Sequence, residues 1–448
     1  MTFGNRFRTK RVATVCSAAT FLIGLGAQAQ EAAPPAEPAP AVPAEAAPEV
    51  PAATAAPVET EAAAAAAAPE AAPVPEEAPP AEGPVEPAEA PEEAGGVSLF
   101  AFVDAYYGAN TSPIGAPAPA HRAYDGTRGF NLAWLGTDIT YDGGEVGATA
   151  SFRLGQSNPI FFGGDTGPAF YPLTQAFLTW KPTEQLTFDA GMFGTIYGAE
   201  VAESWLNLNY TRGALYYAMQ PFWHVGVKGA YVINDMFTIK ALVANGTNQL
   251  NAVDNQKPQV GGQLAISPSE NFSLALGYLH QIDPDSAVMF PSGGRSPFDN
   301  FFDVVAVANL GDLSLVANFD YNIAQPPDGS DADSTSFWGA SLAAGYKISE
   351  LFGVAVRGEY LRDNDFGLWA RTDALADPTD PDSGPLFTTD GNNLYTATLT
   401  LEVKPHENFI IRWDNRIEAS EEDIFYDLDN EATGTFMNSV LGLVVKTN

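Results

Sequence analysis

The chain has 448 residues, 46% of them hydrophobic, and a formal net charge of −34. A chain this acidic lacks the basic surface that nucleic acid requires, so nucleic acid is excluded as a partner. The single cysteine, Cys16, lies near the start of the chain, before the predicted mature sequence. The mature protein therefore has no disulfide and no cysteine metal site, and we expect no cofactor and no bound metal.

Residues 1–29 have the three parts of a secretory signal peptide. Basic residues occur between Arg6 and Arg11, an apolar run covers 12–26, and small residues at 27 and 29 form a cleavage site. The apolar run is too short to anchor the chain in a membrane, and no later run approaches roughly eighteen apolar residues. The sequence predicts export, with a mature start near Gln30.

Residues 30–96 form a linker made almost wholly of Ala, Pro and Glu, with no Lys or Arg. Such a composition cannot bury enough apolar surface to offset chain entropy, so we expect disorder. At roughly 3 Å per residue the linker could reach well over 100 Å, across much of a periplasm. It could contact the cell wall there, and a passive leader is the alternative.

Residues 97–448 repeat a unit of strand, short turn, strand and long loop. The stretch from Tyr171 to Gly198 is typical, because Ala176, Leu178 and Trp180 share one face and polar residues alternate with apolar ones in the next strand. This period of two marks strands with one apolar face. The repeat predicts about sixteen strands, with fourteen to eighteen as the range. Short turns include the proline-containing stretches 181–184, 267–270 and 404–407, where proline cannot continue a ladder.

Amphipathic aromatic residues mark both ends of these strands. Those near short turns are Tyr141, Trp180, Tyr231 and Tyr346, and those next to long loops are Tyr107, Tyr278, Tyr321, Tyr360 and Tyr395. Two aromatic girdles around apolar-faced strands are typical of an outer-membrane barrel. We predict an all-β fold, a transmembrane antiparallel β-barrel over 97–448, with outer-membrane lipid around it and the linker in the periplasm. Sixteen strands leave an aqueous lumen.

Charged residues concentrate on the face opposite the apolar one. The pore-lining candidates are Arg153, Asp189, Lys228, Lys240, Arg357, Glu359, Arg412, Asp414, Arg416 and Glu418. An Arg or Lys on the lipid face would cost roughly 2–4 kcal/mol near the midplane, so these residues are expected to face water. They either screen solutes or form cross-strand ion pairs that stiffen the wall. Arg357, Arg412 and Arg416 could form a basic strip.

The third long loop, Ile196–Gln220, carries residues that are unusual at a solvated tip, namely Trp205, Leu206, Leu208 and Tyr210. We predict that it folds inward and packs on the wall, with Glu200 and Glu203 facing the opening. Glu200, Glu203, Trp205 and Arg212 are the candidates for a constriction.

Several segments resemble a known family. FVDAYYGAN at 102–110, TQAFLTWKP, LTFDAGMFGTIYGAE, NLNYTRG, PFWHVGVKGAYV and VANGTN are similar to consecutive blocks of the OmpL-like β-barrel porin family. The similarity is clearest from about 97 to 250 and implies an outer-membrane channel without a defined substrate. Met192 stands where that family often has lysine, and Thr247 where it often has an aromatic residue. If that lysine lines the pore, selectivity differs in this chain.

These observations predict a porin-like channel for passive diffusion of small hydrophilic solutes or ions, constricted by the third loop. The alternative is a surface receptor or adhesin that acts through acidic loops, among them 377–382, where a Ca²⁺ site competes with a solvated loop. We expect no enzyme, because none of the four histidines lies in a hydrolase motif. The acidic loops predict mild cation preference at low salt, whereas an exposed basic strip would favour anions. The sequence does not specify the oligomeric state.

Overall fold

The computed structural model of this chain describes residues 95–112, 128–161, 172–252, 257–282, 299–325, 333–364, 370–371, 386–387, 391–429 and 431–447. The predicted signal peptide and all but the last two residues of the predicted linker lie outside these ranges, as does the acidic stretch 377–382. The division of the chain at 29 and 96 therefore stays a prediction. The first strand begins at Gly96, within one residue of the predicted start of the barrel.

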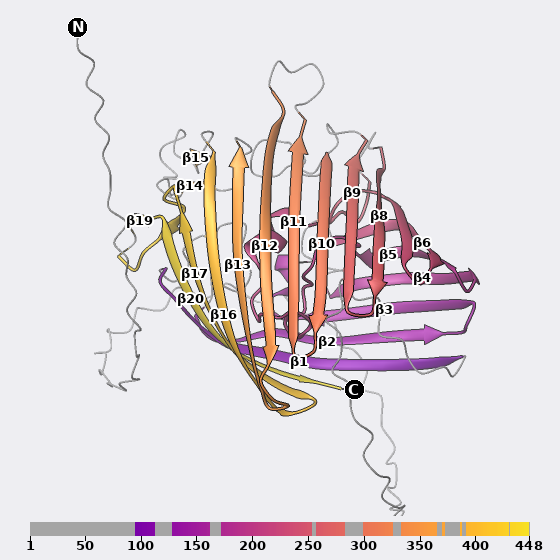
Figure 1. Ribbon diagram of the computed structural model, residues 1–448, viewed down its shortest axis with the longest axis horizontal. Helices are drawn as coiled ribbons and strands as arrows, with labels where there is room; N and C mark the ends of the chain where they lie inside the picture. Colours follow the sequence, from indigo (N-terminus) through magenta and orange to yellow (C-terminus); the bar gives the residue numbers. More distant parts are fainter. Residues whose placement is uncertain are drawn as a thin grey trace, which may run out of the picture. The chain divides into compact units, whose positions relative to one another are not determined.

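Sixteen strands form one closed antiparallel barrel (Figure 1). The first eight are β1 (Gly96–Asn110), β2 (Gly129–Asp142), β3 (Val146–Leu154), β4 (Leu173–Thr183), β5 (Leu186–Gly194), β6 (Trp223–Asn234), β7 (Phe237–Ala244) and β8 (Gln259–Ser269). The others are β9 (Phe272–Gln281), β10 (Asn300–Leu310), β11 (Leu313–Ala324), β12 (Thr335–Lys347), β13 (Phe352–Asn364), β16 (Asn392–His406), β17 (Phe409–Ser420) and β20 (Thr435–Lys446). Each strand pairs with the next along the chain, and β20 pairs with β1 to close the ring. The predicted fold class and strand number are confirmed.

Four short strands lie in the long connections. They are β14 (Ala370–Arg371) with β15 (Leu386–Phe387), and β18 (Phe425–Tyr426) with β19 (Ala432–Thr433). Among the residues that the structure describes, no helix is both long and apolar enough to cross a membrane.

The faces of the strands alternate as the sequence predicts. On β17, Trp413 and Ile417 are each 49% exposed, whereas the intervening Asp414 and Arg416 are buried. Because side chains on a strand point to opposite faces in turn, one face of the barrel is apolar and exposed and the other is polar and covered. This is the arrangement expected of a wall with lipid outside and polar groups inside.

Aromatic rings are in contact from strand to strand near the long-loop ends. Trp338 contacts Tyr360 with ring centroids 5.2 Å apart, and Tyr360 contacts Tyr395 at 5.1 Å. Tyr278 and Phe302 form a similar pair at 4.9 Å on β9 and β10. Such rings suit the interface between acyl chains and headgroups, so this row forms one of the predicted girdles.

The sequence predicts short turns at the three proline-containing stretches, but in the structure the strands continue into them. The strands β4, β8 and β16 continue through Pro182, Pro268 and Pro405 and end only at Thr183, Ser269 and His406. In each case the register shifts across the proline, at Trp180/Thr183, Ile266/Ser269 and Val403/His406. A bulge leaves the extra residue outside the ladder, so proline's missing N–H has no cost there.

The connection between β5 and β6 holds two short helices, η1 (Ser204–Leu206) and α3 (Ala214–Met219). The helix α3 packs against β11, β12 and β13. A further short helix, α1 (Asn158–Phe161), follows β3. These elements place residues 196–220 against the buried, polar face of the barrel.

Candidate functional site

Two carboxylates of the inner wall hold the backbone of the 196–220 segment. Asp414 on β17 accepts hydrogen bonds from the backbone N–H groups of Tyr210 and Thr211 at 3.0 and 3.2 Å, and from Thr211 Oγ1 at 2.9 Å. Glu359 on β13 accepts from the N–H groups of Ala214 and Leu215, both at 3.1 Å. Those N–H groups begin α3 and have no partner within the helix, so the wall satisfies them. The strands thus fix the path of the segment.

Three wall arginines bind its carbonyl groups. Arg412 Nη1 donates to the carbonyls of Ser204 and Asn207, both at 2.7 Å. Arg416 donates to the Arg212 carbonyl at 2.9 Å, and Arg357 donates to the Thr211 carbonyl at 2.8 Å. The arginines therefore act on the segment as hydrogen-bond donors.

The same arginines are paired with acids. Arg357 pairs with Glu200 at 2.7 Å and with Glu359 at 3.3 Å. Arg412 pairs with Glu402 at 2.7 Å, and Arg416 pairs with Glu418 at 2.8 Å. Arg357 and Arg416 do lie in one row, because both stand opposite Thr398 on β16. All three arginines are at most 6% exposed, so the predicted basic strip exists as covered ion pairs. This favours the stiffening role over the screening role for these positions.

Glycines on the inner face provide room for side chains of the segment. An ideal Cβ on Gly442 of β20 would lie 2.1 Å from the Tyr210 ring, and one on Gly339 of β12 would lie 2.6 Å from Leu215. On the same strand β12, a Cβ on Gly345 would lie 2.8 Å from Leu208. Only a residue without a side chain allows these approaches. The sequence did signal these positions, as glycines at inward-facing places in strands, but they were not recognised as contacts.

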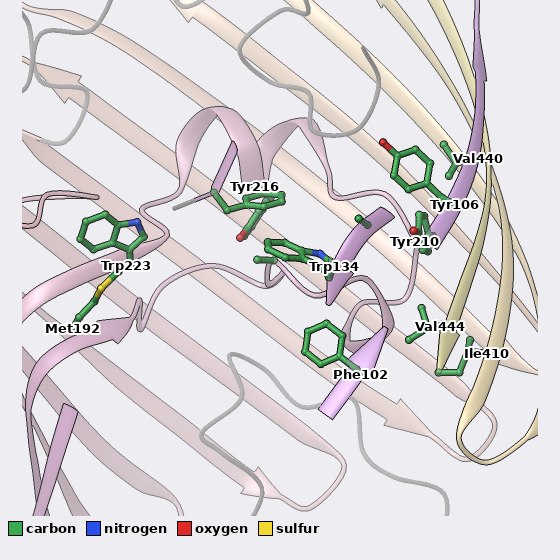
Figure 2. Close-up of a cluster of buried hydrophobic side chains, with 13 residues drawn as sticks. Phe102, Tyr106, Trp134, Met192, Tyr210, Tyr216, Trp223, Ile410, Val440 and Val444 are labelled. Carbon is green, nitrogen blue, oxygen red and sulfur yellow. The ribbon is translucent and has the colours of Figure 1, made fainter. Parts of the chain in front are cut away.

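Aromatic side chains join the segment to β1 and β2. Figure 2 shows Trp134 beside Tyr216, with Tyr106 and Tyr210 close to Val440. The Trp205 ring lies over Phe102 with centroids 4.1 Å apart, and the Phe102 side chain is 3% exposed. Tyr210 is fully buried, whereas Leu206 is 44% exposed and does not pack as the sequence predicted. The apolar contacts therefore come from the aromatic residues.

The start and end of the segment are attached to the other side of the barrel. The Tyr197 hydroxyl donates to the Tyr278 carbonyl on β9 at 2.8 Å, and Gln263 on β8 donates to the Ile196 carbonyl. On β11, Asn318 Oδ1 accepts from the Ala199 N–H at 3.1 Å, and Asp320 accepts from Gln220 at 3.1 Å. The contacts of Tyr197, Gln263 and Asn318 were missed because amides and tyrosine hydroxyls give no charge pattern in the sequence, whereas Asp320 is a wall carboxylate.

Glu200 and Glu203 bind the wall instead of facing the opening. Glu200 accepts from Arg357 and from the Gly213 N–H, both at 2.7 Å, and Glu203 pairs with Arg153 at 2.9 Å. Burial raises the pKa of Glu200 above its ordinary value of 4.5, the Arg357 guanidinium opposes this rise, and the Glu359 carboxylate adds to it. Because Arg212 is also buried, all three charged candidates for the constriction are held in the packing between the segment and the wall.

Asp189, Lys228 and Lys240 lie on a different part of the wall. Lys228 Nζ is 3.3 Å from Asp189 Oδ2, and Thr179 Oγ1 donates to Asp189 Oδ1 at 2.6 Å. Lys240 on β7 stands opposite Ala230 on β6. Met192 on β5 is 4% exposed and belongs to the buried cluster shown in Figure 2, together with Trp223, Phe102 and Tyr210. Position 192 is therefore covered by the packing of the 196–220 segment on the wall.

Comparisons with known proteins agree with this architecture. Residues 96–445 match the model of the family described as beta-barrel porin-2, OmpL-like. A search of curated proteins finds no match. Within the described residues no group of three or more His, Cys, Asp or Glu side chains is arranged to hold a metal ion.

Solved structures with a similar fold include the outer membrane protein OmpT of Vibrio cholerae in trimer form and an anion-selective porin from Comamonas acidovorans. Each has 13% sequence identity and a TM-score of 0.51, over 79% of this chain and 100% of the other. This likeness shows the barrel fold, and the family match extends over the same barrel. The chain therefore belongs to the OmpL-like β-barrel porin-2 family and forms an outer-membrane porin barrel.

Proposed function

We propose that this protein is a passive channel for small hydrophilic solutes or ions, and that residues 196–220 narrow it. The observation that carries the proposal is the attachment of this segment to opposite parts of the wall, from Tyr278 on β9 to Asp414 on β17. A segment held from both sides has to cross the interior. A solute that enters the barrel must therefore pass beside it.

The attachments are numerous and specific enough to keep the segment in place. Hydrogen bonds to charged groups contribute about 1.5–3 kcal/mol each, more than neutral ones. The wall groups that make such bonds to the segment are Asp104, Arg153, Asp320, Arg357, Glu359, Arg412, Asp414 and Arg416. They come from eight different positions on the wall, so loss of one leaves the others intact. These attachments support a narrowing that is a fixed part of the fold.

The direct test is deletion of Ala202–Tyr210 followed by single-channel recording in planar bilayers. The deletion removes η1 and the contacts to Arg412, so the proposal expects larger conductance per channel. Circular dichroism and resistance to unfolding in detergent establish that the barrel is still folded. Unchanged conductance in a folded deletion protein would contradict the narrowing, and absence of any current in the intact protein would contradict the channel.

We also propose that residues 30–96 lie in the periplasm, where they could contact the cell wall. In support, Gly96 at the start of β1 pairs with Asp142, next to the short turn that joins β2 and β3. Short turns face the periplasm in barrels of this class. An epitope inserted after Pro80 should stain only after the outer membrane is permeabilised, whereas the same epitope in the long connection 283–298 should stain on intact cells. Staining after Pro80 on intact cells would refute this placement.

A further inference from the structure

The connection between β17 and β20, residues 421–434, also turns into the barrel, and all of it except residue 430 is described. Ile424 is 0% exposed and Phe425 is 1% exposed, whereas Leu428 at the far end is 62% exposed. Phe425 and Tyr426 form β18, which pairs with β19 to make a short hairpin. Connections between strands normally run through solvent and do not bury large apolar side chains. The base of this connection is therefore packed inside the barrel, and its tip is exposed.

The buried residues of this connection share one hydrophobic cluster with α3. The helix contributes Ala214, Leu215 and Met219 to the cluster, and the connection contributes Ile424 and Phe425. The members from the wall are Ala324, Phe337, Leu361, Leu394 and Phe436. The Phe425 ring stacks on the Phe436 ring with centroids 5.6 Å apart. The helix, the connection and the wall thus form one apolar core.

This shared cluster lies at those ends of the strands that carry the long connections. Ala324 is the last residue of β11, Phe337 is the third of β12, and Phe436 is the second of β20. On β13, Leu361 lies two residues nearer to that end than Glu359, which binds the N–H groups at the start of α3. The connection therefore meets α3 at the mouth of the barrel and not in its middle.

The helix α3 has no charged residue, and its sequence is ALYYAM. Leu215 and Met219 are four residues apart and share one face of the helix, the face that belongs to the cluster with the connection. Tyr216 and Tyr217 lie elsewhere on the helix, with ring centroids 6.0 and 6.4 Å from the ring of Phe161 in α1. A helix that is apolar all round has to be covered all round. The connection supplies part of this cover on the Leu215 face.

Hydrogen bonds define the path of the connection. At its start, the Glu421 N–H donates to the Asn393 carbonyl at 3.1 Å, and the Asn393 side-chain amide donates to Glu421 Oε2 at 2.6 Å. At its base, the Ser420 N–H donates to the Gly434 carbonyl at 2.7 Å. In the tip, Asp427 Oδ1 accepts from two backbone N–H groups at 2.9 and 3.0 Å. The connection is therefore attached to the wall at both ends and has an ordered turn between them.

We propose that residues 421–434 form a strap that holds α3 inside the barrel and closes the mouth above this helix. The inference rests on the proposed narrowing by residues 196–220, and it adds a second element that keeps the narrowing in place. Polar groups of the wall bind the backbone of α3 at its start, whereas the strap covers its apolar side chains. Because a close-packed cluster loses contacts around any large side chain that is removed, loosening the strap releases the helix. The channel is therefore wider when the strap is displaced.

The test uses a cysteine in place of Ala218, which lies on α3 and packs against the shared cluster. The only cysteine of the chain, Cys16, lies in the predicted signal peptide, so Ala218→Cys supplies the single thiol of the exported protein. Its rate of reaction with a polar maleimide, measured on the folded barrel in detergent, reports how often α3 is uncovered. Adding Ile424→Ala and Phe425→Ala should raise this rate at least about tenfold, because the loss of two buried side chains destabilises the packing. The same two changes should increase the single-channel conductance of the protein that retains Ala218.

The matched control is Leu428→Ala, because Leu428 belongs to the same strap but is 62% exposed. It should leave the labelling rate and the conductance unchanged. If the double variant does not fold, Phe425→Leu, which keeps a smaller apolar side chain, should raise the labelling rate by a smaller factor. An unchanged rate in a folded strap variant overturns the strap. Faster labelling without a change in conductance supports the hold of the strap on α3 and contradicts the narrowing, and a folded protein that carries no current contradicts the channel alone.

Discussion

The Tyr210 hydroxyl donates a 2.6 Å hydrogen bond to Asp104 Oδ1, across 106 positions of sequence. Asp104 belongs to β1 and Tyr210 to the inward segment, and both side chains are completely buried. The other carboxylate oxygen of Asp104 accepts from Ser204 Oγ, also at 2.6 Å. One wall carboxylate thus holds two points of the segment, which makes this contact a good place to measure how strongly the segment is attached.

Tyr210→Phe should destabilise the folded barrel by about 1.5–3 kcal/mol, the value of a hydrogen bond to a charged group. The ring stays in place beside Gly442, so the change isolates the hydroxyl. Urea unfolding in detergent measures the loss. In a cycle with Asp104→Asn, the two changes together should cost less than the sum of the single changes. Strict additivity would show that the two groups do not interact.

Gly442→Leu should displace the Tyr210 ring, because even a Cβ at this position would lie 2.1 Å from it. Overpacking of this kind typically costs about 1–3 kcal/mol. Since the segment can yield more easily than the barrel wall, we expect larger single-channel conductance in a folded barrel. The control is Gly358→Leu on β13, where a Cβ would meet nothing within 4 Å. Equal conductance in the two variants would argue that Tyr210 does not hold the segment in place.

Arg412→Gln should be one of the most damaging single changes in the wall. Arg412 is 6% exposed, binds two carbonyls of the segment and pairs with Glu402. Removing one partner of a buried ion pair typically costs about 3–5 kcal/mol, because the other charge is left buried. Lys404→Gln removes the second, exposed partner of Glu402 and should cost about 0–1 kcal/mol. Similar unfolding midpoints for the two variants would contradict the structural role of Arg412.

Much of the barrel could be predicted because strand periodicity reports directly which face is buried. The alternation over Phe409–Glu418 assigned Arg412, Asp414 and Arg416 to the inner face, and the structure places them there on β17. The proline-containing ends were misread because a bulge, which needs the partner strand to define it, looks like a turn in a single sequence. The register of Pro182 and Pro405 follows from neighbouring strands and not from local residues.

The site could be predicted only in part. The aromatic residues of the third loop correctly indicated that it packs inward, as Trp205 and Tyr210 do. The pairing of each charge could not be predicted, because Arg357 meets Glu200 across 157 positions. When the acidic partners are unknown, the three arginines suggest a basic surface. In the structure, glutamates balance their charge and all three side chains are buried.

The stability that Glu200 contributes to the folded barrel should depend on pH. Burial raises the pKa of Glu200 above 4.5, so the folded protein holds this proton more tightly than the unfolded chain does. Stability from this group is therefore fully present below about pH 4.5 and is lost as the pH rises through the folded-state pKa. The Glu200→Gln variant has no ionisable group at this position, so it does not lose this stability as the pH rises. The free energy of unfolding of the variant, relative to the intact protein, should increase as the pH is raised from 4.5 to 8.

The difference between the two proteins is the informative quantity, because other acids titrate in both and cancel. Glutamine has one oxygen to accept from both Arg357 and the Gly213 N–H, so the variant starts from a lower stability at pH 4.5. Chemical unfolding at several pH values gives the slope of the difference with pH. A slope of zero would show that Glu200 has the same proton affinity in the folded and unfolded chains. A slope of the opposite sign would show that the Arg357 guanidinium, and not burial, controls this carboxyl group.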